Sequence, residues 1–114
     1  MFGQYFIKSF YDVQYKNFEI NKDHGFEEEE GYNLSEKIAL MHSDLTEALE
    51  YSRKDMYAKS DHIPEFLGVE EEFADVIIRI MNVAERFAMR VPEAILAKQA
   101  FNAARPFKHG GKKF

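Results

Sequence analysis

The segment EEEFADVIIRI, residues 70–80, restricts the possible folds more than any other part of the sequence. From this segment to residue 84, apolar residues recur at helical spacing and cover more than half of the circumference of a helix. They are Phe73, Val76, Ile77, Ile78, Ile80, Met81, Val83 and Ala84. A helix this apolar is expected to be central in its fold and also to face a second subunit. Glu72 and Asp75 lie three residues apart at the border of this apolar face, where their charges repel.

The rest of the chain also predicts helices, and no segment predicts a strand. The expected helices span about residues 4–22, 34–56, 69–88 and 92–104. Asn33 and Glu36 have the spacing of a capping box, Pro92 suits a first helical turn, and Pro64 and Gly68 mark a connection. We therefore expect an all-α fold, a bundle of four to five helices, and a single domain over residues 1–114.

Composition and charge exclude several classes of protein. The chain has no Cys, which excludes disulfides and thiolate metal sites. No apolar run approaches the ~18 residues of a membrane helix, and no secretory signal is visible, so the expected location is the cytoplasm. The net charge is −5 overall and +5 from Ala94 to Phe114, so the other 93 residues carry −10. An acidic body disfavours a nucleic-acid polymer as partner and favours a small phosphorylated ligand held with cations.

Two pairs of carboxylates border the apolar faces of neighbouring helices. They are Asp44 with Glu47, and Glu72 with Asp75. Packing the two helices side by side would bring the four carboxylates together, which requires a cation to neutralise them. Oxygen ligands without His or Cys suit Mg²⁺, with Mn²⁺ as a substitute. The alternatives are a solvated acidic surface and a di-iron bundle, but no His follows a Glu at the spacing that a di-iron site needs.

These motifs carry a family resemblance. Asp44-x-x-Glu47, followed after 24 residues by Glu72-x-x-Asp75, resembles the ExxE…ExxD signature of the all-α nucleoside triphosphate pyrophosphatases, the superfamily of MazG and the dimeric dUTPases. The ending KQAFNAARPFKHGGKKF resembles the MazG-like carboxy terminus, and IALMHSDLTEALEYSR resembles the second helix of that family. The resemblance covers about residues 34–114. One departure is Asp44, which stands where the family has Glu.

The resemblance implies a Mg²⁺-dependent pyrophosphohydrolase that cleaves a (d)NTP between the α and β phosphates. The four carboxylates would be the metal ligands and the catalytic residues, and the protein would be a homodimer or homotetramer. The residues implied in substrate binding are Lys98, Asn102, Arg105, Lys108 and Lys112. The backbone of Gly110 and Gly111 can turn N–H groups toward an anion, so the tail is expected to close over the pyrophosphate.

Two questions remain open at this stage. The shorter side chain of Asp44 keeps an alternative function in view, a non-catalytic helical module that binds a nucleotide or a partner for regulation. The preferred base is also open. In the first helix, Gln14 and Asn17 are candidates to hydrogen-bond a base, and Phe10 or Tyr11 to stack on one, although each also suits the core or the surface.

Overall fold

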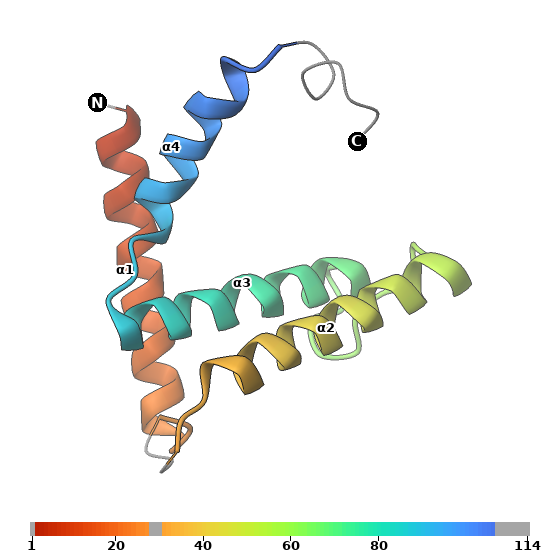
Figure 1. The fold of residues 1–114 in the computed structure, drawn as a ribbon. Helices are drawn as coiled ribbons and strands as arrows, with labels where there is room; N and C mark the ends of the chain where they lie inside the picture. The colour runs from red at the N-terminus through yellow and green to blue at the C-terminus, as the bar shows by residue number, and fades with distance from the viewer. Residues whose placement is uncertain (1, 28–30, 107–114) are drawn as a thin grey trace.

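Four helices form the described part of the chain, residues 2–27 and 31–106, in a computed structural model (Figure 1). They are α1 (Phe2–Asp23), α2 (Leu34–Lys54), α3 (Gly68–Phe87) and α4 (Val91–Ala103). Within these ranges the β-structure is limited to one isolated bridge between Lys59 and Leu67. The predicted all-α class is confirmed, and the predicted helix limits lie close to the observed ones because the cap and proline signals were correctly placed.

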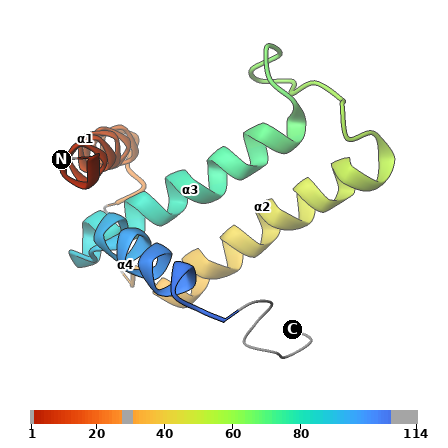
Figure 2. The ribbon, with the colours of Figure 1, turned by 90° about the horizontal axis from the view of Figure 1, so that it is seen from above.

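The helices are arranged as a hairpin and two further helices at one end of it. α2 and α3 run antiparallel, side by side, and α1 crosses the end of the pair (Figures 1 and 2). α4 packs on the amino-terminal part of α1, where the Tyr11 hydroxyl donates a hydrogen bond to Glu93. α4 therefore leads away from the α2–α3 pair (Figure 1).

Local chemistry fixes the ends of these helices. The Asn33 side chain accepts a hydrogen bond from the Glu36 N–H at 3.1 Å, as its capping position predicts. α3 begins at Gly68, where an added Cβ would lie 2.3 Å from the Tyr51 ring, so only glycine lets α2 approach this closely. α3 ends at Ala88 in the left-handed conformation, with φ of 54°. This residue sets the direction in which the chain leaves toward α4.

The core is centred on the carboxy-terminal half of α3. Buried hydrophobic residues are confined, in the described ranges, to Ala48, Met81, Val83 and Ala84. α1 packs on this region through polar groups as well, since Gln14 donates to Glu85 at 3.1 Å and Asn17 to the Met81 sulfur at 3.3 Å. Through these contacts Gln14 and Asn17 take part in the packing of α1 against α3. None of the described helices has the length and apolar character needed to cross a membrane.

Candidate metal-binding site

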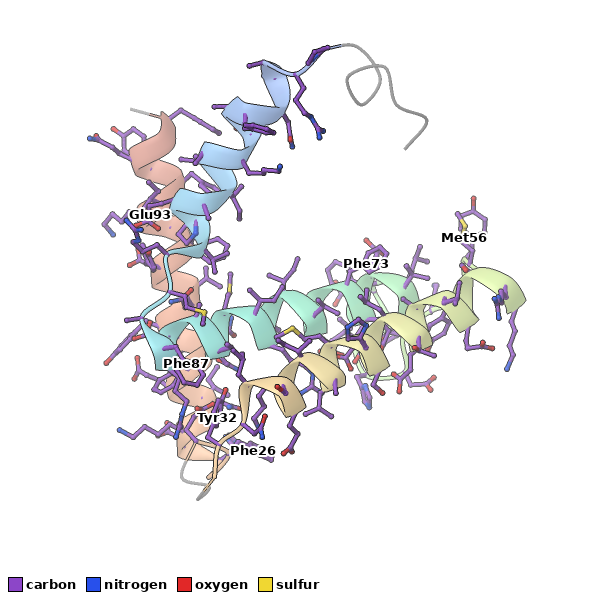
Figure 3. The ribbon with its side chains drawn as sticks, in the orientation of Figure 1. Phe26, Tyr32, Met56, Phe73, Phe87 and Glu93 are labelled. Carbon is purple, nitrogen blue, oxygen red and sulfur yellow. The ribbon has the colours of Figure 1, made fainter. Side chains whose placement is uncertain are left out.

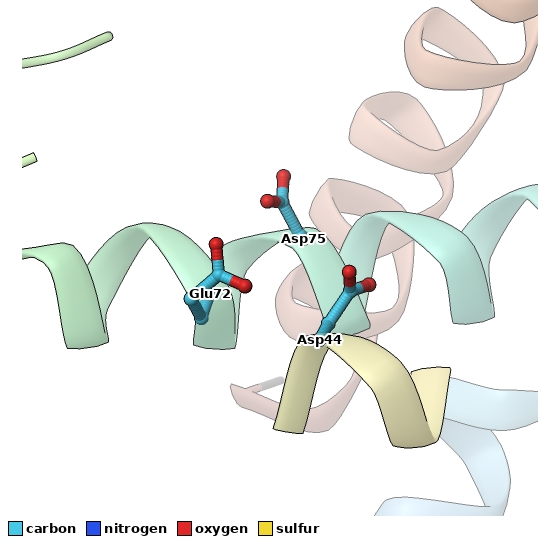
Figure 4. Close-up of side chains that lie close together, drawn as sticks. All are labelled: Asp44, Glu72 and Asp75. Carbon is cyan, nitrogen blue, oxygen red and sulfur yellow. The ribbon is translucent and has the colours of Figure 1, made fainter. Parts of the chain in front are cut away.

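Three carboxylates meet where α2 lies against α3. Asp44 comes from α2, and Glu72 and Asp75 come from successive turns of α3 (Figure 4). One oxygen atom from each residue lies within 4.8 Å of the others. The register of the two helices explains the meeting, because Asp44 and Ala48 are the buried residues of α2 and lie one turn apart on the side facing α3.

Glu72 is the most constrained member of this acidic cluster, which is Asp44, Glu72 and Asp75. Its side chain is enclosed, with only 7% of the residue exposed, and its Oε2 atom has no hydrogen-bond partner in the described part of the chain. Burial raises the pKa of Glu72 to about 7, aided by a hydrogen bond with Glu47 and by the charges of Glu47, Asp75 and Asp44. A buried acceptor without a partner costs free energy unless a ligand satisfies it.

Asp75 and Glu47 complete the acidic environment. Burial, followed by the charge of Asp44, raises the pKa of the Asp75 carboxyl above its usual value. Glu47 lies outside the group of three, but its closeness to Glu72 contributes to the raised pKa of Glu72. Of the four carboxylates predicted from the sequence, three are therefore brought together and the fourth is adjacent.

Arg79 is a member of the site that the sequence motifs did not identify. Its Nε atom lies 2.6 Å from Oδ2 of Asp44, and the pair is partly buried. The available signal was its position one helical turn after Asp75, on the same side of α3. The arginine neutralises part of the charge of the cluster, and it would have to share or release Asp44 when a metal ion binds.

The donor atoms of the cluster fit a hard divalent cation. All are carboxylate oxygens, which Mg²⁺ and Mn²⁺ accept, and Glu72 Oε2 is a buried oxygen that lacks a partner among the described residues. Burial is the largest cause of the raised pKa values of Glu72 and Asp75, so the charged form of each carboxylate is poorly solvated at this point. The cluster can hold a metal ion, although an acidic cluster alone does not define a reaction.

A second polar network fastens the α2–α3 connection beside Glu72. The Ser60 hydroxyl donates to Glu71, and His62 Nδ1 lies 2.8 Å from the other oxygen of Glu71. The hydrogen bond with Glu71 raises the pKa of His62, and the bonds from Ser60 and His62 lower the pKa of Glu71. Both carboxylate oxygens of Glu71 therefore bond to residues of the α2–α3 connection, whereas its neighbour Glu72 belongs to the acidic cluster.

The residues predicted to bind substrate lie apart from this cluster. Lys98 and Asn102 line an open groove on α4, and Arg105 is exposed beyond the end of that helix. Because α4 packs on α1 and leads away from α2 and α3, one chain does not bring these residues to its own carboxylates (Figure 1). Lys108 and Lys112, with Gly110 and Gly111, lie outside the described residues.

Comparison with known proteins does not place the chain in a family. No protein-family model, curated protein or solved structure matches it. The geometry thus defines an all-helical protein with a buried acidic cluster that can hold a metal ion.

Proposed function

We propose that this protein is a Mg²⁺-dependent nucleotide pyrophosphohydrolase, which converts a (d)NTP to the monophosphate and pyrophosphate. The observation that carries the proposal is Glu72, a buried carboxylate that faces Asp44 and Asp75 and has an oxygen without a partner among the described residues. The resemblance of Asp44-x-x-Glu47 and Glu72-x-x-Asp75 to the ExxE…ExxD signature supplies the expected reaction. Asp44, Glu72 and Asp75 would hold the metal ion, with Glu47 beside them.

The residues of the site have separable tasks in this proposal. Mg²⁺ bound at the cluster would screen the triphosphate and lower the pKa of a water molecule. Hydrolysis would form a bond between a water oxygen and the α phosphorus and break the bond from the α phosphorus to the bridging oxygen, which leaves with pyrophosphate. Glu47, which lies beside the three carboxylates that would hold the metal ion, can accept the proton of the water.

Polar and basic residues of α4 and of the segment after it would bind the phosphates. We assign this role to Lys98, Asn102 and Arg105, and to Lys108 and Lys112 of the tail. Since α4 leads away from the cluster of its own chain, their contact with a triphosphate requires a second copy of the chain or a movement of α4.

The exposed surface supports assembly as a homodimer or homotetramer. The chain exposes 8948 Å², whereas a compact monomer of its mass, 13.4 kDa, exposes about 6,500 Å². When the residues outside the described ranges are counted as fully exposed, and their area and mass are removed from both sides of the comparison, an excess of about 900 Å² remains. Stable interfaces bury ~800 Å² or more per partner. Phe73, labelled in Figure 3, and Ile77 are half exposed on α3, and we expect a second copy to cover them.

One observation favours a second candidate, a nucleotide-binding or partner-binding regulatory module without turnover. The Arg79–Asp44 ion pair gives one carboxylate of the cluster a cationic partner without a metal ion. A protein of this kind would be stabilised by a nucleotide but would release no pyrophosphate.

A product assay separates the two candidates. The purified chain is incubated with each of the eight common NTPs and dNTPs and Mg²⁺, and the products are resolved by chromatography. Monophosphate and pyrophosphate, lost on addition of EDTA, are expected from one or a few substrates. No turnover with Mg²⁺ or Mn²⁺, together with nucleotide-dependent stabilisation, would favour the module.

The variant Glu72→Gln tests the carboxylate that carries the proposal. Loss of a ligand oxygen and its charge is expected to lower turnover by about 100-fold or more, since even residues outside the ligand shell change activity 10- to 100-fold. Glu50→Gln, at an exposed glutamate of α2, is the matched control. Circular dichroism should show the same helix content in both variants, and full activity of Glu72→Gln would remove this residue from the mechanism.

A further inference from the structure

A cavity of about 260 Å³ lies beside the acidic cluster, between the end of α1, the start of α2 and the carboxy-terminal half of α3. Its walls include Asn21, Phe26, Tyr32, Arg79 and Asn82. None of these residues belongs to the acidic motifs. Its volume lies near the lower end of ligand pockets, ~300 to 1,000 Å³, which suits a single ring system better than a whole nucleotide.

Asn82 is the clearest indication of a ligand in this cavity. The residue is 9% exposed, and its Oδ1 atom has no hydrogen-bond partner in the described ranges. A buried amide of this kind destabilises the fold, and an apolar residue of similar size would avoid the penalty. An asparagine amide offers an acceptor and a donor side by side, which is the arrangement that reads the edge of a planar heterocycle.

Aromatic side chains supply flat surfaces at the same place. Phe26 is about half exposed, and Tyr32 is fixed by Arg86 over its ring at 3.9 Å and by Phe87 edge-on at 5.8 Å (Figure 3). Aromatic side chains can stack on any nucleobase, because every base has a flat face. A rigid wall also lowers the entropy lost when a ligand is ordered.

The charged residues that line the cavity suit the neutral ring of a ligand better than its phosphates. The cavity is lined by two carboxylates, Glu27 and Glu36, and by two cations, Lys37 and Arg79. These opposite charges balance, so the cavity favours a neutral group over a triphosphate. Arg79 connects the two regions, because it lines the cavity while its Nε atom pairs with Asp44 of the acidic cluster.

We propose that this cavity receives the nucleobase of the nucleotide whose phosphates lie at the acidic cluster, with Asn82 reading the edge of the base. The assignment rests on the proposed function for the identity of the ligand. It differs from the expectation that the base would contact Gln14 or Asn17, because neither residue lines this cavity. Gln14 donates to Glu85, although its Oε1 atom also lacks a partner among the described residues, and Asn17 donates to the Met81 sulfur. Arg79 then acts as a positioning residue between the base and the phosphates.

The test uses free nucleosides, which carry a base but no phosphate and need no metal ion. Each ribo- and deoxynucleoside is added to the ¹⁵N-labelled full chain, and amide shifts are followed by NMR. Saturable shifts are expected at Asn21, Arg79 and Asn82 for at least one base. Asn82→Ala should weaken that nucleoside at least 10-fold with an unchanged or higher Tm, because an unsatisfied buried amide is removed.

Matched variants make the result decisive. Asn21 lines the cavity, so Asn21→Ala should also lower the affinity for the nucleoside. Asn17 lies on the same helix but does not line the cavity, so Asn17→Ala should leave the affinity unchanged. Absence of shifts in the cavity, unchanged affinity in Asn82→Ala, or loss of binding in Asn17→Ala would overturn the assignment. The product assay is read separately: nucleoside binding without turnover contradicts only the hydrolase, and turnover without an effect of Asn82→Ala contradicts only the base site.

Discussion

The two halves of α3 differ in what they bury. The carboxy-terminal half buries four consecutive residues, Met81 to Ala84, against α1 and α2. The amino-terminal half buries Gly68 and Glu72, while Phe73 and Ile77 are about half exposed (Figure 3). One half therefore anchors the fold by apolar packing, and the other exposes apolar surface and encloses charge.

This difference separates apolar packing from buried negative charge along one helix. A carboxylate such as Glu72 is costly to bury, and the packing of the other half offsets that cost. Functional sites commonly break local rules of stability that the rest of the fold satisfies. Substitutions in the two halves should accordingly have different consequences.

The largest effect on folding is expected from Met81→Ala. Met81 is 6% exposed, and truncating a buried methionine costs about 2 to 5 kcal/mol of unfolding free energy. Urea unfolding followed by circular dichroism measures the loss. Ile77→Ala in the other half is the control and should cost under ~1 kcal/mol, as exposed positions do. Equal losses in the two variants would show that the halves do not differ in this way.

A pH-dependent effect of intermediate size is expected from Glu72. Its pKa is about 7 in the fold, above its ordinary value of 4.5. Between these two values the folded chain binds more protons than the unfolded chain, so its stability falls as the pH rises through this window, by on the order of 1 to 3 kcal/mol.

The metal-free protein is unfolded at pH 5 and pH 8, with and without Mg²⁺, to measure this slope. Glu72→Gln should remove the Glu72 part of the slope, and Mg²⁺ should stabilise the wild type more at pH 8 than at pH 5. The assignment fails if wild type and Glu72→Gln share the same pH dependence.

The smallest effect on unfolding free energy is expected from Phe73→Ser. Phe73 is 51% exposed, so the single chain loses little packing, under ~1 kcal/mol. If a second copy covers this face, sedimentation velocity should show a shift toward smaller species at the same helix content. Phe2→Ser, at an exposed position of α1, is the comparison. An unchanged sedimentation coefficient would exclude Phe73 from the interface.

Sequence reasoning located the helices because their signals are local. Asn33, Gly68 and Pro92 mark helix ends through their own hydrogen bonding, lack of a side chain or fixed φ. The grouping of Asp44 with Glu72 and Asp75 was also predictable, since each lies at the border of an apolar face and two such faces pack together.

The features that were missed depend on the relative placement of distant segments. The partner of Arg79 depends on the register between α2 and α3, and the cavity at Asn82 combines walls from three segments. The direction of α4 follows from one left-handed residue, Ala88, and from contacts such as Tyr11 with Glu93. No helical periodicity encodes these relations, so Lys98 and Arg105 were expected nearer to the carboxylates than one chain brings them.

The hairpin of α2 and α3 also has a consequence for the order of synthesis. All three clustered carboxylates lie between residues 44 and 75, and the two helices that carry them end at Phe87. Domains form as the chain emerges from the ribosome, beginning at the amino terminus. The three carboxylates are therefore synthesised before α4, and α4, which packs on α1, is the last of the described helices to be added.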